Sequence, residues 1–509
     1  MVCKTMAAID VGSYELQLKI FEVSQKKGIV MVNHVRKVIE LGRDTYVYGR
    51  VDFRHIDMLC ETLFDFTRIM REYRVDDYIA YATSSIREAE NREIIIDRIK
   101  VKTGLDVSVI SNSQQRFLVY KALAVKQEVS KVANEGTAIV DVGAGSLQIS
   151  LFNEGVLITT QNIKLGSLRI RELLYKLSDD RQHFNLLIDE LINNDIATFK
   201  KMYLKDIVIK NIIAIGDYVD YFAYKNGKFI DYMTREQFNI RFDALLGKDA
   251  YKLSKKMDIT EEEALLMMPC IKVYKHVLDE TDAENIWFPR VDLCDGIAAE
   301  YVVENKIIKI NHDFDRDIIN AAKVISKKYK ANITHINTLE GNVLMIFDAM
   351  KKIHGLSDRE RTLIQICAIL HDCGKFITIS HPGEASYNII MSTEIIGLSH
   401  KEREIVANVV KFNTVDYFDE RVNIHHGNQK DYLLVAKLVA ILRVANAMDR
   451  SHLQKFKNSK AVIKDDNTLV ITTYCREDIT LERGLFNSKA DFFEEVYGIK
   501  PVLRQKKEV

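Results

Sequence analysis

The sequence reads Asp10-Val11-Gly12-Ser13-Tyr14-Glu15-Leu16-Gln17-Leu18 near its start, and the pattern returns in register as Asp141-Val142-Gly143-Ala144-Gly145-Ser146-Leu147-Gln148-Ile149. An apolar run precedes each copy, Met6–Ile9 and Ala138–Val140. Alternating apolar residues follow each copy, with the period of a half-buried strand. Aspartate and glycine between two such runs are typical of a tight turn. Each copy therefore predicts strand, turn and strand, and the repetition predicts two similar lobes.

The glycines of the two turns indicate an anion site. Glycine lets backbone N–H groups approach an anion closely, and successive amides form an anion-binding concavity. An aspartate at the strand end can hold a metal-bound water or fix the turn. One Asp-x-Gly turn alone favours an ordinary hairpin, but two copies in register favour facing turns that clamp a phosphate chain. The predicted phosphate-binding residues of the turns are Asp10, Gly12, Ser13, Asp141, Gly143, Gly145 and Ser146.

Composition and charge exclude several other classes of protein. The 509 residues suggest about three or four domains. Basic and acidic residues both number 72, so no global field attracts polyanions, and we expect neither a membrane nor a sequence-specific nucleic-acid partner. The most apolar helix candidate, Leu433–Met448, is too short and too charged to span a bilayer. Seven scattered cysteines without a CxxC pair, and no signal peptide, indicate reduced thiols in the cytoplasm.

Three further segments carry a family resemblance: Tyr81–Ala89, Val109–Gln115 and Leu165–Arg169. Together with the repeat, they resemble the actin/Hsp70/sugar-kinase superfamily and, within it, the exopolyphosphatase/guanosine-pentaphosphate phosphohydrolase (Ppx/GppA) family, over roughly residues 5 to 305. The resemblance implies an α/β fold with duplicated actin/Hsp70-like, ribonuclease-H-type lobes, lobe I over 1–125 and lobe II over 126–305. It also implies polyphosphate or guanosine polyphosphate bound with Mg²⁺ between the lobes, and a possible homodimer.

The carboxylates that this family uses for hydrolysis are replaced by amides. The family places a general-base Glu where this chain has Gln114-Gln115, and a second Glu, which helps to hold Mg²⁺, where it has Gln148. An amide cannot take a proton at neutral pH and is a weaker Mg²⁺ ligand than a carboxylate. We therefore expect phosphate binding with slow or absent hydrolysis, unless Glu15 replaces one lost carboxylate. Arg87 is expected to clamp phosphate, the alternative being a solvated helix arginine.

Residues 310 to 460 change to helical periodicity. His335, His371-Asp372 and Asp449 follow the order of HD-domain metal phosphohydrolases, which this segment resembles. Imidazole and carboxylate ligands suit Mn²⁺, Fe²⁺, Zn²⁺ or Mg²⁺, and Lys375 is expected to reach a substrate phosphate. The alternative is a hydrogen-bonded core histidine beside a turn aspartate. We predict an all-α HD-like domain over 306–458 and a small α+β domain over 459–509, with the dipeptide His425-His426 at the surface.

Three functions remain open from the sequence. The first is an exopolyphosphatase or guanosine-pentaphosphate phosphohydrolase with weakened catalysis at Gln114, Gln115 and Gln148. The second is a non-catalytic protein that senses polyphosphate or a nucleotide. The third is a metal-dependent HD-type phosphohydrolase acting through the C-terminal half, with Lys375 in its site. We favour the first, an enzyme.

Overall fold

The computed structural model describes residues 3–126, 135–177, 184–204, 207–225, 228–309, 312–414, 429–465 and 467–506. His425-His426 lies outside these residues. The chain divides into two compact units, Met1–His312 and Asp313–Val509, and each is described by itself. Among the described residues, no helix combines the length and the apolar character needed to cross a membrane.

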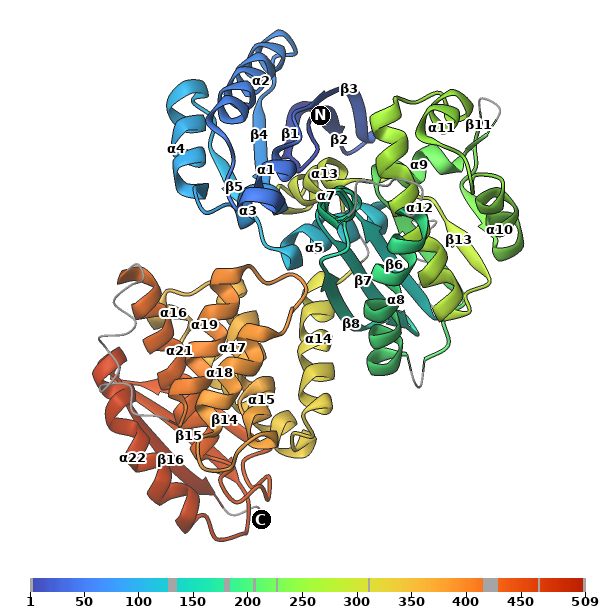
Figure 1. The fold of residues 1–509 in the computed structure, drawn as a ribbon. Coiled ribbons are helices and arrows are strands. Elements are labelled where there is room, and N and C mark those ends of the chain that lie inside the picture. Colours follow the sequence, from blue (N-terminus) through green and yellow to red (C-terminus); the bar gives the residue numbers. More distant parts are fainter. Residues whose placement is uncertain are drawn as a thin grey trace. The chain divides into compact units, whose positions relative to one another are not determined.

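Among the described residues, the first unit contains two large sheets and a two-stranded ribbon, and the five-stranded sheet forms lobe I (Figure 1). Its order is β3-β2-β1-β4-β5. Strands β1, β2 and β3 are antiparallel neighbours, whereas β4 and β5 continue the sheet in parallel to β1. The strands are β1 (Lys4–Val11), β2 (Glu15–Ser24), β3 (Gly28–Val38), β4 (Asp77–Ala82) and β5 (Val107–Val109).

Lobe II repeats this topology in a six-stranded sheet of order β12-β13-β9-β6-β7-β8. Strands β8, β7, β6, β9 and β13 take the places of β3, β2, β1, β4 and β5, and β12 is added antiparallel to β13 at the edge. The predicted duplication is therefore confirmed. The strands are β6 (Thr137–Val142), β7 (Leu147–Asn153), β8 (Val156–Ile163), β9 (Asn211–Ile215), β12 (Tyr232–Thr234) and β13 (Asn285–Trp287), with a small ribbon of β10 (Tyr224–Lys225) and β11 (Lys228–Phe229).

Helices cover both sheets (Figure 1). The helices of lobe I are α1 (Leu41–Tyr48), α2 (Phe53–Glu72), α3 (Ser84–Glu88), α4 (Arg92–Thr103) and α5 (Asn112–Val125). Those that follow are α7 (Ser167–Leu177), α8 (Phe184–Tyr203), α9 (Asp217–Ala223), α10 (Arg235–Asp243), α11 (Ala250–Met257), α12 (Glu261–Thr281) and α13 (Leu293–Glu304). Helix α13 packs against α5 and β1, because Ile297 and Ala298 share one apolar cluster with Met6 and Leu118. The end of the lobe II segment thus completes the core of lobe I.

Strand β2 differs from the half-buried strand that its alternation predicts. Leu16, Leu18 and Ile20 belong to the apolar core, as expected. The intervening polar side chains, among them Glu15 and Lys19, are also buried, at 7% exposure each. They are buried because this face of β2 is turned toward lobe II and the start of α13, where Lys19 meets Asp292. A polar stripe on the strand therefore marks an internal polar site.

The second unit is helical at its start and mixed at its end (Figure 1). Its helices are α14 (Phe314–Lys328), α15 (Ile333–Ala349), α16 (Lys351–His354), α17 (Asp358–Leu370), the 3₁₀ turn η3 (Cys373–Phe376), α18 (Pro382–Ser392), α19 (His400–Phe412), α21 (Gln429–Ala447) and α22 (Thr480–Tyr497). A sheet of order β14-β15-β16 joins β14 (Ser459–Lys464), β15 (Thr468–Tyr474) and β16 (Lys500–Lys506). Helix α22 packs against α21. The predicted helical character is confirmed.

Candidate functional site

The two repeated turns have the same hydrogen-bonded geometry. In the first, Gly12 N–H donates to the Glu15 carbonyl at 3.1 Å, and in the second, Gly143 N–H donates to the Ser146 carbonyl at 3.0 Å. A helix begins beside each turn and donates to its carbonyls, Gly42 N–H to Ser13 at 2.7 Å and Ser167 N–H to Gly143 at 3.0 Å. Each turn is therefore held by the two strands that it connects and by the helix that begins beside it.

Both turns line one cavity of about 100 Å³, which we call the interlobe cleft. Strands β1 and β6 each end at its floor, and their aspartates occupy equivalent registers: Asp10 pairs with Gln17, and Asp141 pairs with Gln148. The structure thus brings together nine of the residues predicted from the sequence: Asp10, Gly12, Ser13, Gln115, Asp141, Gly143, Gly145, Ser146 and Gln148.

Hydroxyl groups connect the two turns. Ser13 Oγ, Tyr46 Oη and Ser84 Oγ lie 2.8 to 3.0 Å from one another beside the first turn. The second turn reaches this group at Gly145, where a Cβ atom would lie 2.1 Å from Tyr46 Oη and 2.5 Å from Ser84 Oγ. Only glycine fits at this approach, since such distances are far inside van der Waals contact. The requirement for Gly145 is therefore steric.

Arg169 fastens this junction from lobe II. Its Nε donates to the Gly145 carbonyl at 2.9 Å, and its Nη2 forms an ion pair with Glu88 at 2.7 Å. The guanidinium carbon also lies 3.9 Å from the centroid of the Tyr46 ring, a favourable cation–π position. The side chain therefore ties the second turn to α1 and α3 of lobe I.

The three glutamines at the degenerate positions have different environments. Gln114 closes the capping box of α5: its Oε1 accepts from Ser111 N–H at 3.0 Å. Gln115, the next residue, lines the interlobe cleft. Gln148 also lines it and is 3% exposed, and its Oε1 has no hydrogen-bond partner. An unsatisfied buried acceptor is costly, so Gln148 presents an acceptor for a group that enters the cleft.

Arg87 does not line the interlobe cleft. Its Nη1 donates to the Ile110 carbonyl at 2.7 Å, and its Nη2 donates to the Asn112 side chain. The guanidinium thus joins α3 to the start of α5. These contacts connect two elements of lobe I, and the phosphate clamp expected at Arg87 stays a prediction.

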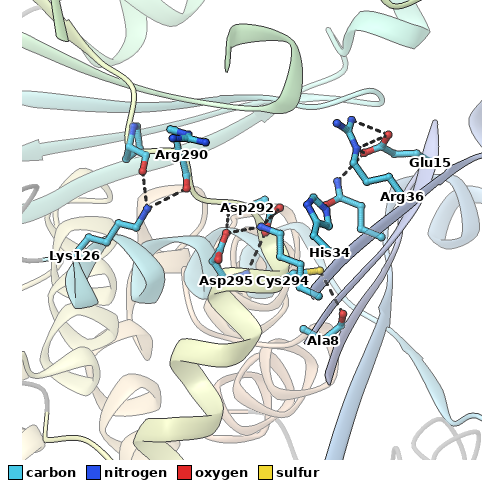
Figure 2. A network of polar contacts seen from close by, with 12 residues as sticks. Ala8, Glu15, His34, Arg36, Lys126, Arg290, Asp292, Cys294 and Asp295 are labelled. Carbon is cyan, nitrogen blue, oxygen red and sulfur yellow. Dashed lines mark hydrogen bonds and ion pairs between the residues drawn. The ribbon is translucent and has the colours of Figure 1, made fainter. Parts of the chain in front are cut away.

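Besides its aspartates, the interlobe cleft is lined by a glutamate, Glu15. Its side chain accepts from Arg36, with Nε 2.9 and 3.1 Å from the two oxygens and Nη2 2.8 Å from Oε2 (Figure 2). Gln17 Nε2 donates to the same carboxylate at 2.8 Å. On the lobe II side, Arg36 Nη1 donates to Tyr221 Oη at 3.3 Å. The charge of Glu15 is therefore neutralised by an arginine that also contacts the other lobe.

A second, partly buried group of ion pairs connects β2 to α13 (Figure 2). Lys19 Nζ lies 2.6 Å from Asp292 and 2.8 Å from Asp295. Burial, followed by the charge of Asp292, raises the pKa of Asp295 to about 6. For Asp292, burial acts in the same direction, but Lys19 and the hydrogen bonds outweigh it and lower its pKa. One ammonium is thus shared by two carboxyls of unequal acidity.

A larger pocket of about 990 Å³ adjoins the interlobe cleft and shares Gly216, Val291 and Asp292 with it. Arg36 and Lys19 line its lobe I side, and Trp287 lies on its lobe II side. Lys126 at its edge donates to the carbonyls of Pro289 and Arg290 at 2.8 and 3.1 Å (Figure 2). The cleft therefore continues into a space much larger than a single phosphate group.

Two family profiles match the chain. The profile of the Ppx/GppA phosphatase family matches residues 20–223, and that of Ppx/GppA phosphatase, domain III, matches residues 319–484. Together they cover most of the sequence, including the second of the twin turns.

The chain belongs to the Ppx/GppA phosphatase family.

Curated relatives match part of the chain. Exopolyphosphatase 1 of Mycobacterium tuberculosis (strain H37Rv) is 25% identical over 149 residues, 28% of this chain and 41% of that protein. The bifunctional 3-dehydroquinate synthase/phosphatase of Fusobacterium nucleatum is 23% identical over 175 residues, 33% of this chain and 26% of that protein. The chain therefore spans less than half the length of these relatives.

Solved structures share the fold. An exopolyphosphatase from Cytophaga hutchinsonii superposes with a TM-score of 0.52 at 20% identity, over 61% of this chain and 100% of that one. A Ppx/GppA family member from Aquifex aeolicus gives a TM-score of 0.50 at 20% identity, over 61% and 100%. At this identity the likeness establishes the fold, and the expected duplicated architecture is confirmed.

The residues of the interlobe cleft suit a divalent metal ion, on which phosphatases of this family generally depend. Mg²⁺ is bound in proteins by one or two carboxylates together with waters and substrate phosphates. Asp10 and Asp141 offer two carboxylates at equivalent strand ends, and Glu15 lies in the same cleft. In the part of the chain that the structure describes, three or more metal-ligand side chains converge elsewhere, not in this cleft. The donor set thus fits an ion that keeps water and shares the substrate.

The convergent group lies in the second unit and consists of His335, His371 and Asp372, all buried. Helix α15 supplies the first, and the C-terminal end of α17 supplies the other two. His335 Nε2 lies 3.2 Å from His371 Nε2, and His371 Nε2 lies 3.3 Å from Asp372 Oδ1. Burial alone would raise the pKa of Asp372, but His371 and Lys375 outweigh it and hold this pKa well below its ordinary value.

Two other predicted residues take different places around this group. Asp449 is not one of its members; its Oδ2 lies 2.7 Å from His335 Nδ1, and its Oδ1 accepts from Gln454 N–H at 2.8 Å. Asp449 therefore orients the histidine from behind, as a carboxylate partner of a ligand does. Lys375 Nζ lies 2.6 Å from Asp372 Oδ2, so its ammonium pairs with a predicted ligand, and its contact with a substrate phosphate stays a prediction.

Several site residues were missed by the sequence reasoning. Arg36, Tyr46 and Arg169 contact residues that line the interlobe cleft, and Lys19 lines the adjoining pocket. In the second unit, the ring of His452 stacks on His335 with centroids 3.9 Å apart. The polar alternation of β2 was a usable signal for Lys19. Arg36 and His452 gave none, because only the folded chain brings them to their partners.

Proposed function

We propose that this protein binds a phosphoanhydride chain in the interlobe cleft, with Mg²⁺, and hydrolyses its terminal link slowly. Inorganic polyphosphate and guanosine polyphosphates are the substrate classes. The observation that carries the proposal is the pair of equivalent turns, at Gly12 and Gly143, which line one cavity with their aspartates at matching registers.

The chemistry of the cleft supports binding more strongly than turnover. Backbone amides of the turns are preorganised donors for phosphate oxygens, and such donors persist whatever side chains the turn carries. When bound, Mg²⁺ would neutralise charge on the phosphates, with Asp10 and Asp141 as its protein ligands. The amides at Gln115 and Gln148 line the cleft but cannot accept a proton from water. Loss of a general base alone costs about 10²–10⁴ in rate.

The experiment is titration calorimetry of tripolyphosphate with Mg²⁺, run beside an assay of released phosphate. We expect saturable binding with little turnover for the natural sequence. Gly145→Ala should abolish binding, because its Cβ would lie 2.1 Å from Tyr46 Oη. Gly484→Ala is the matched control, since that glycine has open space around it. Absence of binding, or equal binding in Gly145→Ala, would remove the proposal. Tight binding without any release would favour a sensing protein.

A second candidate function rests on the hydrogen bonds of the convergent histidines. His335 Nδ1 faces a carboxylate oxygen of Asp449, and His371 Nδ1 lies 2.8 Å from the Ala368 carbonyl. A ring nitrogen that faces an acceptor carries the proton, so His335 Nε2 holds a lone pair in the neutral ring, whereas His371 Nε2 faces both this lone pair and Asp372 Oδ1. The two Nε2 atoms lie 3.2 Å apart, and either a proton on His371 Nε2 or a cation held between the rings satisfies this contact.

We therefore also propose that His335, His371 and Asp372 hold a divalent metal ion. With metal–nitrogen bonds of about 2.0–2.1 Å, two nitrogen ligands of one ion lie about 3.0–3.4 Å apart, which includes the separation of the two Nε2 atoms. A bound ion would polarise a phosphoryl oxygen or generate hydroxide. The second unit would then act as a metal-dependent phosphohydrolase, and its resemblance to HD-domain enzymes stays a prediction.

Metal analysis tests this second candidate. We expect about one equivalent of Mn, Fe, Zn or Mg per chain, lost in His371→Ala. His381→Ala is the matched control, because His381 is exposed and is not a member of the group. Less than stoichiometric metal, or unchanged content in His371→Ala, would rule out the metal centre.

The cellular location and assembly remain proposals. All seven cysteines are free thiols, which suits the reducing cytoplasm. The homodimer that the resemblance implies stays a prediction.

A further inference from the structure

We propose that Glu15 is the general base of the interlobe cleft and that Arg36 uncovers it by exchanging its partner for substrate phosphate. This inference rests on the proposed function of the cleft. It assigns the missing proton acceptor to a position where the repeat itself gives no carboxylate, since the second copy has Ser146 at the place of Glu15.

The other carboxylates of the cleft are already committed. Asp10 and Asp141 end equivalent strands and form the symmetric pair suited to Mg²⁺. Asp292 caps α13 and forms an ion pair with Lys19 at 2.6 Å. Glu15 is the carboxylate that breaks the symmetry of the repeat: it begins β2 directly after the first turn, lines the cleft and is 7% exposed. It therefore faces the cleft in which we propose that the phosphate chain binds, and it is shielded from bulk water.

In the structure, hydrogen bonds from Arg36 and Gln17 engage the carboxylate of Glu15. A carboxylate whose lone pairs accept several strong hydrogen bonds is a poor proton acceptor. The resting arrangement is thus a neutralised pair, and catalysis requires that the pair be separated.

Arg36 is built to change partners. Its side chain is 35% exposed, against 8% for that of Glu15, and it lines the larger adjoining pocket. A phosphate offers a guanidinium the same bidentate geometry as a carboxylate. Tyr221 Oη, 3.3 Å from Arg36 Nη1, itself donates to Glu263 at 2.8 Å. This contact with lobe II gives the guanidinium a second anchor when it leaves Glu15.

The resulting step is an ordinary hydrolysis. The oxygen of a water forms a bond to the terminal phosphorus, and the bond from that phosphorus to the bridging oxygen breaks. The electron pair of the broken bond leaves with the shortened chain. The proton of the water passes to Glu15 and from there to solvent. The products are orthophosphate and a chain shorter by one unit.

The test uses the full chain with tripolyphosphate and Mg²⁺. Calorimetry measures binding, and the rate of phosphate release is measured over a range of pH. Glu15→Gln should lower kcat about 10²-fold or more. The Kd should stay equal or fall, because the Glu15 carboxylate no longer competes with phosphate for Arg36. The acidic limb of the pH–rate profile should disappear. Glu15→Asp should recover part of the rate, because it restores a proton acceptor. Arg36→Lys should weaken binding, because an ammonium cannot form the bidentate hydrogen bonds that a guanidinium makes with phosphate.

Glu22→Gln, on the same strand but not lining the cleft, is the control for a general effect on β2. Turnover of Glu15→Gln within about twofold of the natural sequence would overturn the inference. An inactive Glu15→Asp would do the same, and so would binding by the natural sequence without measurable turnover. In each of these cases the proposed binding function would survive. If the natural sequence fails to bind tripolyphosphate, the proposed function itself fails.

Discussion

At the scale of single residues, the two adjacent glutamines of α5 differ in a way that their shared position in the motif hides. Gln115 lines the interlobe cleft, whereas Gln114 closes a capping box with Ser111. We predict that Gln115→Glu combined with Gln148→Glu raises phosphate release, because both carboxylates would face the substrate. Gln114→Glu alone should leave it unchanged, since a glutamate serves the same cap. A rise with Gln114→Glu alone would contradict this assignment.

A second prediction at this scale concerns Asp295. Its pKa, raised from 3.8 to about 6 by burial and Asp292, means that the folded state binds this proton more tightly than the unfolded state. The protonated carboxyl of Asp295 therefore contributes its whole share to the free energy of unfolding below about pH 4, and this share is lost as the pH rises through 6. The side chain at this position in the Asp295→Asn variant cannot titrate. The free energy of unfolding of the variant, relative to that of the natural sequence, should therefore rise by on the order of 2 kcal/mol between pH 4 and pH 7.

Denaturant unfolding followed by the fluorescence of Trp287, the single tryptophan, measures this difference in the unit that contains Asp295. A gap between the two proteins that is independent of pH would show that Asp295 titrates normally.

The roles of side chains were predictable from the sequence only where a local motif or a fixed order of residues indicates them. Asp10, Asp141 and the turn glycines follow from the repeat, and His335 and His371 follow from their order. The pairing of Glu15 with Arg36 depends on register between β2 and β3, which a one-residue shift would reverse. The place of Asp449 behind His335 depends on how α15 meets the turn after α21. Such contacts are set by packing, not by motif.

At the scale of elements, Gly166 supports the second turn. A Cβ there would lie 2.3 Å from the Ala144 carbonyl oxygen, the Gly145 carbonyl carbon and the Ser146 nitrogen, all backbone atoms that cannot swing aside. We predict that Gly166→Ala displaces the turn and weakens tripolyphosphate binding at least tenfold, by calorimetry. Because the neighbouring cores are untouched, far-ultraviolet circular dichroism should stay unchanged. Native-like affinity in Gly166→Ala would show that the turn does not form the site.

The elements themselves were largely predictable, with informative exceptions. The repeat predicted β1, β2, β6 and β7, because aspartate and glycine punctuate two apolar runs. Strand β16 was missed: Pro501 near its start argues against a strand, and the structure tolerates it because β16 is an edge strand. The burial of both faces of β2 at all but one position was also missed, because alternation reports polarity and not the presence of a second lobe over the polar face.

At the scale of the whole molecule, the two units carry separate candidate sites. The interlobe cleft lies within Met1–His312, and the histidine group lies within Asp313–Val509. Ligands stabilise the unit that binds them, by about 2.7 kcal/mol at a hundredfold excess over Kd. We predict two calorimetric unfolding transitions for the full chain. Tripolyphosphate with Mg²⁺ should raise the midpoint temperature of the transition of the first unit, and a chelator should lower that of the second unit. A single transition that responds to both would contradict independent sites.

The central claim is that twin turns grip one phosphate chain. The most direct measurement is a crystal structure of the protein grown with tripolyphosphate and Mg²⁺. We predict the chain between the two turns, with backbone amides near Gly12 and Gly143 donating to its oxygens and Asp10 and Asp141 facing the ion. Tripolyphosphate bound elsewhere, or contacting the turn of one lobe and not the other, would contradict the account.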